Sequence, residues 1–247
     1  MKRLAIPILL VMACACGRKA PEVPQARIYN APKVTGTILV DGILDEPDWQ
    51  NAPLSEAFAD IRGVDFEPKP TMETHMKMLW DDECLYIAGI IEESNVTGSL
   101  TEHDAIIYKD NDFEIFIDPD KDCRNYFEIE TNALGTVMDL LMDRPYRDQG
   151  HFFLPWDLRG LKLATHVNGT LNDASDTDRG WTVEVAIPFE ALTVDFTNPK
   201  ELQDWHINFS RVEWLKAGGP EENWVWNPTG VVDMHQPEFW GVLHFEK

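Results

Sequence analysis

Positive charge and cysteine are both scarce in this sequence. Against 43 acidic residues stand 21 lysines and arginines, which gives a formal net charge of −22 at pH 7. A surface this acidic repels nucleic acids and polyanionic glycans, so DNA or RNA binding is excluded. The 247 residues include 4 cysteines, too few for the disulfide framework of a small secreted domain. The stability of the fold must therefore come from a hydrophobic core.

Motifs of catalytic chemistry are missing as well. The sequence contains no Gly-x-Ser-x-Gly, Walker or Gly-x-Gly-x-x-Gly motif, and its seven histidines show no metal-ligand spacing. Glycoside hydrolysis requires two carboxylates on either side of the scissile bond. Glu114, Glu128 and Glu130 alone do not identify such a pair among so many acidic residues. We therefore expect a protein without catalytic activity of its own.

The residues that are abundant favour β-structure. Sixteen prolines and 15 glycines leave little room for long helices, and 9 Trp, 12 Phe and 5 Tyr favour strands with packed faces. Short helices are predicted only at Glu46–Ala52, with Asp45 as N-cap, and at Phe189–Leu192. Ten strands, enough for two packed sheets, are predicted at Val34–Val40, Thr71–Leu79, Leu85–Glu92, Asp112–Asp118, Tyr126–Asn132, Thr136–Leu141, Leu161–Val167, Trp181–Ile187, Trp205–Val212 and Val242–Phe245.

The N-terminus has the pattern of an export signal. Residues 1–15 combine a basic start, Met1-Lys2-Arg3, with an apolar run that is too short to span a bilayer. The end of this run resembles the cleavage box of bacterial lipoproteins, in which a cysteine becomes the acylated first residue. We favour Cys16 as that residue because it leaves the longer apolar stretch and precedes Gly17. Acylation at Cys14 and a plain signal peptide remain as alternatives.

Residues 16–32 contain three prolines and no hydrophobic periodicity, which predicts a flexible tether. The folded domain is then expected to span residues 33–247. Covalent lipid would anchor this domain to a bacterial membrane, on its periplasmic or cell-surface side. Cys84 and Cys123 either form a disulfide bond or remain as two thiols.

Five segments occur in the order found in one known family. Together they span about residues 35 to 245, and each has the character of a strand with its turn. The segments are Val40–Trp49, Leu79–Tyr86, Asn111–Asp118, Gly180–Pro188 and Pro237–Gly241. The chain therefore resembles the carbohydrate-binding modules of family 9.

This resemblance implies a two-sheet antiparallel β-sandwich of jelly-roll type that binds a polysaccharide or oligosaccharide without cleaving it. Members of the family hold a sugar between aromatic side chains, sometimes with structural calcium. A sugar ring presents C–H groups on its face and hydroxyls on its edge, so it requires aromatic rings surrounded by polar groups. Separate glycoside hydrolases are the expected partners of such a module.

The resemblance also indicates where the aromatic rings should lie. Tyr108 occupies the first aromatic position of the family, just before the strand at Asp112–Asp118. Met234 occupies the second and is not aromatic, so Trp224, Trp226 or His235 would have to supply a ring. Alternatively, the two tryptophans cap the hydrophobic core beneath the last loop.

Polar groups around the sugar are expected on neighbouring strands. Glu114 matches an acidic residue of the family that points toward the sugar. Glu128 and Arg211 lie on strands that carry such groups, although the family has an arginine and an amide there. The alternative is an opposite-charge pair across neighbouring strands.

Asp118, Asp120 and Asp122 alternate in a turn and offer the oxygen ligands that calcium prefers. Glu93 is a further candidate ligand, and a solvated acidic turn is the alternative. The sequence as a whole predicts an exported, lipid-anchored glycan-binding protein that needs no cofactor apart from this calcium ion. A hydrolase or lyase on the same fold, or a haem-binding or protein-interaction module that uses Met234 and His235, are alternative functions.

Overall fold

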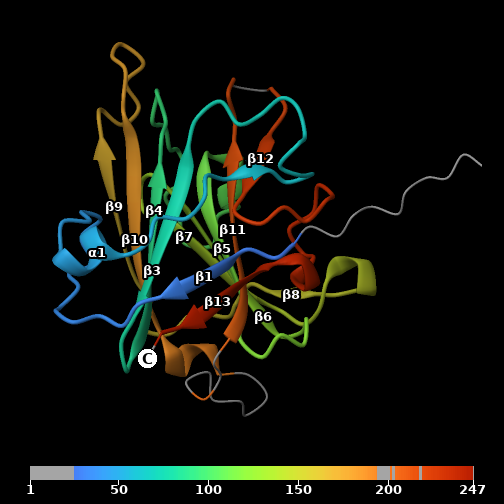
Figure 1. Cartoon of the computed structure of the whole chain (residues 1–247). Helices are drawn as coiled ribbons and strands as arrows, with labels where there is room; N and C mark the ends of the chain where they lie inside the picture. Colours follow the sequence, from blue (N-terminus) through green and yellow to red (C-terminus); the bar gives the residue numbers. More distant parts are fainter. Residues whose placement is uncertain (1–24, 194–200, 202–203, 217–218, 247) are drawn as a thin grey trace, which may run out of the picture.

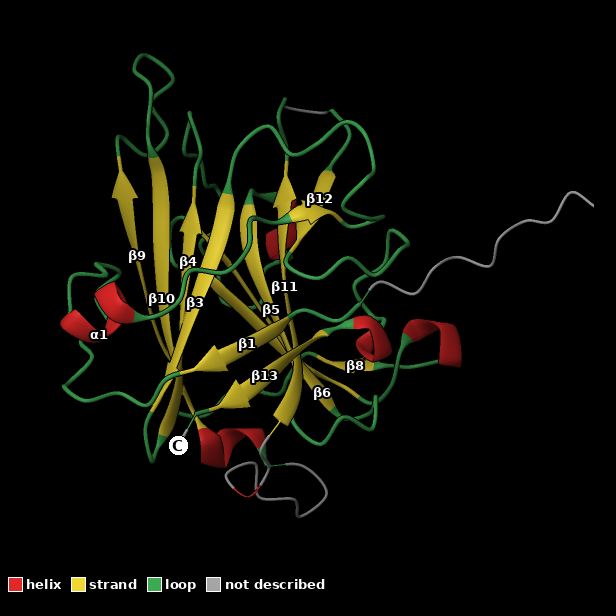
Figure 2. Cartoon of the chain, viewed as in Figure 1, coloured by secondary structure: helices red, strands yellow, loops and turns green. Residues whose placement is uncertain are grey.

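Two β-sheets packed face to face form the structure, a computed structural model that describes residues 25–193, 201, 204–216 and 219–246 (Figures 1 and 2). The larger sheet has the order β1-β13-β11-β5-β6-β7-β8, and β12 and β2 extend it from β11. Its strands are β1 (Ile28–Ala31), β2 (Ala59–Asp60), β5 (Asp112–Asp118), β6 (Tyr126–Asn132), β7 (Val137–Met142), β8 (Phe152–Phe153), β11 (Asp204–Glu213), β12 (Glu222–Val225) and β13 (Gly241–Phe245).

The smaller sheet has four strands in the order β3-β4-β10-β9. Neighbouring strands in both sheets are antiparallel, except that β1 runs parallel to β13. The strands of the smaller sheet are β3 (Thr74–Trp80), β4 (Cys84–Ile91), β9 (Lys162–Asn168) and β10 (Gly180–Pro188). These observations confirm the predicted all-β sandwich.

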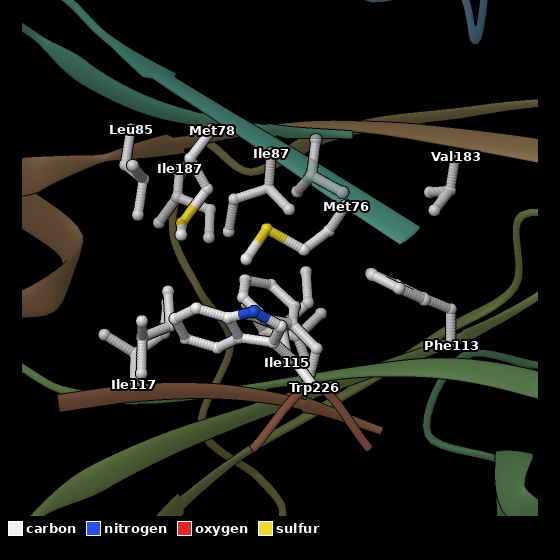
Figure 3. Close-up of a cluster of buried hydrophobic side chains, with 14 of the residues drawn as sticks. Met76, Met78, Leu85, Ile87, Phe113, Ile115, Ile117, Val183, Ile187 and Trp226 are labelled. Atoms are coloured by element: carbon white, nitrogen blue, oxygen red, sulfur yellow. The ribbon is translucent and has the colours of Figure 1, made fainter. Parts of the chain in front are cut away.

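The main hydrophobic core lies between the two sheets. Strand β10 shows how the sequence produces it, because every second residue from Trp181 to Ile187 is buried in this core. In Figure 3, side chains of the smaller sheet such as Met76 and Ile87 face Phe113 and Ile115 of the larger sheet and Trp226, which directly follows β12.

The outer face of the smaller sheet is covered by helix α1 (Pro47–Asn51) and the loop that precedes it. Glu184 of β10 is buried there and accepts hydrogen bonds from the Trp49 indole and from the backbone amide of Gly42. Gly42 has a φ of 83°, and a Cβ there would lie 2.7 Å from the Thr165 carbonyl carbon. The glycine therefore permits close contact between this loop and β9.

Loops cover the outer face of the larger sheet, so β5 and β6 are buried on both faces. A second hydrophobic cluster forms beneath these loops and includes Phe116, Tyr126, Leu140, Met234 and Trp240. This covered outer face contains the pocket described below.

The predicted strand at Val34–Val40 is wrong. Thr35 and Gly36 donate their backbone amides to the Asp48 carboxylate, and Leu39 donates its amide to Glu46. Because acidic side chains near α1 satisfy these amides, the segment does not need a neighbouring strand. The helix is capped at Glu46 rather than at Asp45, and Phe189–Leu192 forms a 3-10 turn.

The expected tether is too long at its C-terminal end. Ile28–Ala31 forms β1, which pairs with β13 over its whole length (Figure 1). The fold therefore begins before Lys33. The signal at residues 1–15, with Cys14, and the candidate lipidation site Cys16 lie outside the described residues. Among the residues described, no helix has the length and apolar character needed to cross a membrane.

Cys84 begins β4, and Cys123 lies in the loop between β5 and β6. They are not joined to each other by a disulfide bond.

Candidate functional site

A pocket of about 490 Å³ opens on the outer face of the larger sheet. Strands β5, β6 and β7 supply its floor, and loops before β5, between β7 and β8, and after β12 supply its walls. The floor residues are Glu114, Phe116, Glu128, Glu130, Met138 and Leu140. The wall residues include Tyr108, Tyr146, Phe152, Val232, Met234 and His235.

Three glutamates, which we call the floor glutamates, give the pocket its polar floor. Glu114 of β5 lies directly opposite Glu130 of β6, and Glu128 follows two residues before Glu130 on the same strand. Since residues two apart in a strand point to the same side, all three project from the outer face. Each is at most 5% exposed. Glu130 also accepts a hydrogen bond of 3.1 Å from the backbone amide of Tyr108.

The floor glutamates lie in an environment that disfavours their charged form. Burial raises the pKa of Glu128 to about 8, and the negative charge of Glu114 adds to this effect. Burial and the neighbouring glutamate likewise raise the pKa values of Glu114 and Glu130 well above the usual range. No lysine or arginine is present among the described residues that line the pocket. The floor is thus a set of closely spaced carboxyl groups without a cationic partner.

Aromatic side chains form the walls of the pocket. Tyr108 lies in a 3-10 turn just before β5 and is 42% exposed. Tyr146 and Phe152, from the segment between β7 and the end of β8, are 47% and 52% exposed. Large exposed aromatic rings beside a buried polar floor are unusual in a folded domain unless they contact a ligand. The arrangement suits a ring-shaped ligand with apolar faces and polar edges.

His235 and Met234 also line the pocket, as the sequence predicted for a ligand site. His235 Nδ1 lies 2.9 Å from the Tyr126 hydroxyl, and its ring contacts Tyr146 edge-on at 4.5 Å. Burial lowers the pKa of His235 to about 4, so its imidazole is neutral at pH 7. Met234 is 7% exposed and packs into the second hydrophobic cluster.

Arg211 does not belong to this pocket, contrary to the prediction. Its guanidinium is fully buried on the inner face of β11 and donates to Glu213 Oε2 from Nε and Nη2, at 2.9 and 2.6 Å. It also donates to Thr74 Oγ1 and to the carbonyl of Glu92. The alternative pairing with Glu128 is wrong too, because Glu128 projects from the opposite face of the sheet.

The two candidate tryptophans are buried in the core rather than exposed as aromatic surfaces for a sugar. Trp224 and Trp226 are 1% and 0% exposed, and both belong to the main core cluster. A Cβ at Gly241 would overlap the Trp226 ring, so the glycine after Trp240 makes room for this core residue. The interpretation that the pair caps the core is therefore the correct one.

The acidic turn after β5 lies apart from the pocket lining. Oxygens of Asp118, Asp120 and Asp122 lie within 4.8 Å of one another. Asp118 already accepts the backbone amides of Lys121 and Cys123, at 3.0 and 2.9 Å. The calcium site at this turn stays a prediction.

Glu93 cannot complete that site. Its carboxylate accepts hydrogen bonds from Asn111, which precedes β5, and from the Trp181 indole. Asp118 ends the same strand, about 20 Å from Asn111 at the usual rise of an extended chain.

Sequence reasoning located part of the pocket. Tyr108, Glu114, Glu128, Met234 and His235 come together as lining residues. Tyr146 and Phe152 were missed because their segment has no strand periodicity. The sequence signal that could have identified them is the presence of aromatic residues in a polar loop rich in Arg, Asp and Gly.

Comparisons with known proteins agree with this architecture. The chain is 25% identical over 165 residues to the exoglucanase XynX of Acetivibrio thermocellus and 26% identical over 164 residues to an endo-1,4-beta-xylanase A of Thermoanaerobacterium saccharolyticum. Each alignment covers 66% of this chain but 13% and 12% of the respective enzyme. The similarity is thus to a small part of two much longer proteins.

Solved structures share the fold. A putative carbohydrate-binding protein from Bacteroides uniformis superposes with a TM-score of 0.66 at 17% identity, covering 90% of this chain and 100% of the other. A carbohydrate-binding module of family 9 from Caldicellulosiruptor kristjanssonii, in complex with cellotriose, superposes with a TM-score of 0.60 at 15% identity over 89% and 94% of the two chains. The same module has also been solved with glucose. The sequence profile of the carbohydrate family 9 binding domain-like family matches residues 40–247, and the chain belongs to this family.

Proposed function

We propose that the chain is a non-catalytic carbohydrate-binding module whose pocket holds one end or unit of an oligosaccharide or polysaccharide. The observation that carries this proposal is the pairing of exposed aromatic walls with a buried polar floor. Tyr108, Tyr146 and Phe152 offer rings to the C–H faces of a sugar, and the floor glutamates accept hydrogen bonds from its hydroxyls. Family membership and the related module crystallised with cellotriose support β-glucan fragments as first probes.

The arrangement of the carboxyl groups favours binding over hydrolysis. A glycoside hydrolase needs an acid and a second carboxylate on either side of the bond that it cleaves. Glu114 and Glu130 are instead direct neighbours on adjacent strands, and both project from one face of the sheet. A sugar in the pocket would therefore lie above both of them. We expect no turnover of chromogenic or native glycans by the purified chain, with Glu114→Gln as the control.

Affinity electrophoresis in gels that contain soluble β-glucan or xylan tests the binding function. A stacked ring contributes about 1–3 kcal/mol, so Tyr108→Ala and Tyr146→Ala should each weaken retention about 5- to 150-fold. The matched control is Tyr108→Phe, which keeps the ring and should retain most of the binding. Retention by no glycan, or equal retention of all four proteins, would contradict the proposal.

We also propose that residues 1–15 direct export and that Cys16 carries a lipid that anchors the module beside separate glycoside hydrolases. The basic start, the short apolar run and the Cys-Gly pair support this. Metabolic labelling with a palmitate analogue should label the parent chain and Cys14→Ala but not Cys16→Ala. Label lost only in Cys14→Ala would move the site to that residue. Label absent from all three would indicate a plain signal peptide.

A further inference from the structure

One acidic side chain beneath the pocket has no role in the function proposed above. Asp112 begins β5, two residues before Glu114, and projects from the same face of the sheet. It is 0% exposed and does not line the pocket. Its Oδ1 accepts the backbone amide of Val212 at 2.8 Å, but no donor among the described residues reaches Oδ2. An unpartnered carboxylate oxygen at this depth costs free energy unless a ligand satisfies it.

A buried hydroxyl lies beside it on the neighbouring strand. Ser210 of β11 is directly opposite Glu114 in the ladder and therefore projects from the same face. It is 0% exposed, and its Oγ has no described hydrogen-bond partner at ordinary geometry. Its hydroxyl partly offsets the effect of burial, which raises the pKa of the facing Glu114 carboxyl. The hydroxyl is an additional neutral oxygen next to the carboxyl groups.

The carboxyl groups themselves have the spacing of metal ligands. One oxygen from each of Asp112, Glu114 and Glu130 can be chosen so that all three lie within 4.8 Å of one another. Charges at this separation repel strongly at low dielectric, and no ion pair with a described lysine or arginine relieves them. The described arginine that is fully buried, Arg211, faces the other side of the sheet.

We propose that Asp112, Glu114 and Glu130 bind a divalent cation of the calcium class at the floor of the pocket, and that the ion coordinates hydroxyls of the bound sugar. Oxygen-only ligands, including a hydroxyl such as that of Ser210, suit calcium. The second half of the proposal rests on the proposed function, since it needs a sugar in the pocket. The ion would occupy the place of a cationic side chain and neutralise the floor.

A small ion fits these residues better than the ammonium group of an amino sugar. A ligand attached to a sugar ring stays within the pocket, where Glu114 and Glu130 are accessible but Asp112 is not. Asp112 is 0% exposed and lies outside the pocket lining, so a group tethered to a sugar ring does not reach its unpartnered oxygen. The experiment must therefore distinguish binding of an amino sugar from binding of a metal ion.

The experiment titrates the chelator-treated full chain with calcium chloride alone, by calorimetry and equilibrium dialysis. We expect a stoichiometric site whose affinity falls at least about tenfold in Glu130→Gln and in Asp112→Asn, because each loses one charged ligand. The matched control is Asp120→Asn, which changes the separate acidic turn and should bind as the parent does at this site. Circular dichroism in the near-ultraviolet checks that each variant folds.

The outcomes separate this inference from the proposed function. Calcium binding that is absent, or that is unchanged in both Glu130→Gln and Asp112→Asn, overturns the metal site. Glycan retention that chelator does not alter overturns the role of the ion and leaves the binding function intact. Calcium bound without retention on any glycan supports the metal site and contradicts the binding function. If the chain prefers glucosamine oligomers to neutral oligomers and chelator does not change this preference, the floor binds an ammonium group. That result would overturn the proposal.

Discussion

Two groups of acidic side chains are buried on opposite faces of the larger sheet, and they differ in how their charge is balanced. On the inner face, Glu213 and Glu93 surround Arg211, with N···O distances of 2.6 and 3.9 Å. Asn111 donates to both glutamates, and the Trp181 indole donates to Glu93. On the outer face, the floor glutamates have no arginine or lysine partner among the described residues.

The difference indicates which group serves the fold and which serves a ligand. A buried charge is tolerated when a partner and hydrogen bonds replace its lost hydration, as they do around Arg211. The floor glutamates must instead keep protons or bind something from outside, and their raised pKa values describe the first of these states. The inner group is therefore complete as it stands, whereas the outer group opens onto a pocket.

The largest expected effect comes from breaking the inner group. Arg211→Met leaves two buried glutamates without their cation and should lower the free energy of unfolding by about 3–5 kcal/mol. Denaturant unfolding at pH 7.5 measures this, with Arg144→Met as a control, because Arg144 pairs with Asp143 and both side chains are exposed. Adding Glu213→Gln to Arg211→Met should restore part of the loss. A variant as stable as the control would show that the two acidic groups do not differ as described.

The outer group should instead make stability depend on pH. Burial raises the pKa of Glu128 to about 8 and raises those of Glu114 and Glu130 as well, so the folded chain holds protons that the unfolded chain has lost. Stability should be greatest near pH 5 and fall as pH rises toward 8, by up to about 1.4 kcal/mol per pH unit for each such group.

Unfolding measured in chelator between pH 5 and pH 8.5 tests this prediction. Glu128→Gln should flatten the profile by removing one of the titrating groups. Calcium should also flatten it, because the ion takes the place of protons at the floor. A profile in Glu128→Gln as steep as in the parent chain would assign the pH dependence to other residues.

A smaller effect should separate the inner aromatic residues from the pocket. Trp226→Phe leaves space in the core and should cost about 1–2 kcal/mol of stability. Glycan retention per folded molecule should not change, because Trp226 is 0% exposed on the inner side. If the Trp226→Phe variant is fully folded but shows reduced glycan retention, Trp226 contributes to the binding site.

The smallest effect is expected from two adjacent phenylalanines of β8. Phe152 and Phe153 are 52% and 55% exposed, but only Phe152 lines the pocket. Phe152→Ala should weaken glycan retention by less than about tenfold, equivalent to about 1.4 kcal/mol, and Phe153→Ala should leave it unchanged. Equal effects of the two substitutions would mean that β8 does not form a wall of the site.

Most of the fold could be predicted because its long strands carry a clear period of two. β5 and β6 were predicted residue for residue, and the alternation in β10 identified the core-facing side. The strands β1, β2, β8 and β12 have two to four residues each, too few to show alternation. Their pairing depends on distant strands, which no local pattern reveals.

The site could be predicted where strand parity or the family resemblance indicates its residues, and the resemblance alone indicated Tyr108, Met234 and His235. Glu114 and Glu128 follow from alternation, because their neighbours in sequence are core residues. The prediction for Arg211 was wrong although the same alternation contradicts it, since Ile207 and Phe209 share its parity and face the core. The walls contributed by Tyr146 and Phe152 come from irregular loops, whose positions depend on tertiary contacts rather than on local sequence.

The parallel pairing of β1 with β13 determines how the domain responds to mechanical load. Hydrogen bonds such as those from Val242 to Arg27 and from Glu246 to Ala31 lie across the direction of β1. A pull on the N-terminal end, with a ligand held in the pocket, would load β1 in shear, so these bonds would have to break together rather than one by one. A domain attached through this end should therefore resist drag far better than one held by a strand that unzips.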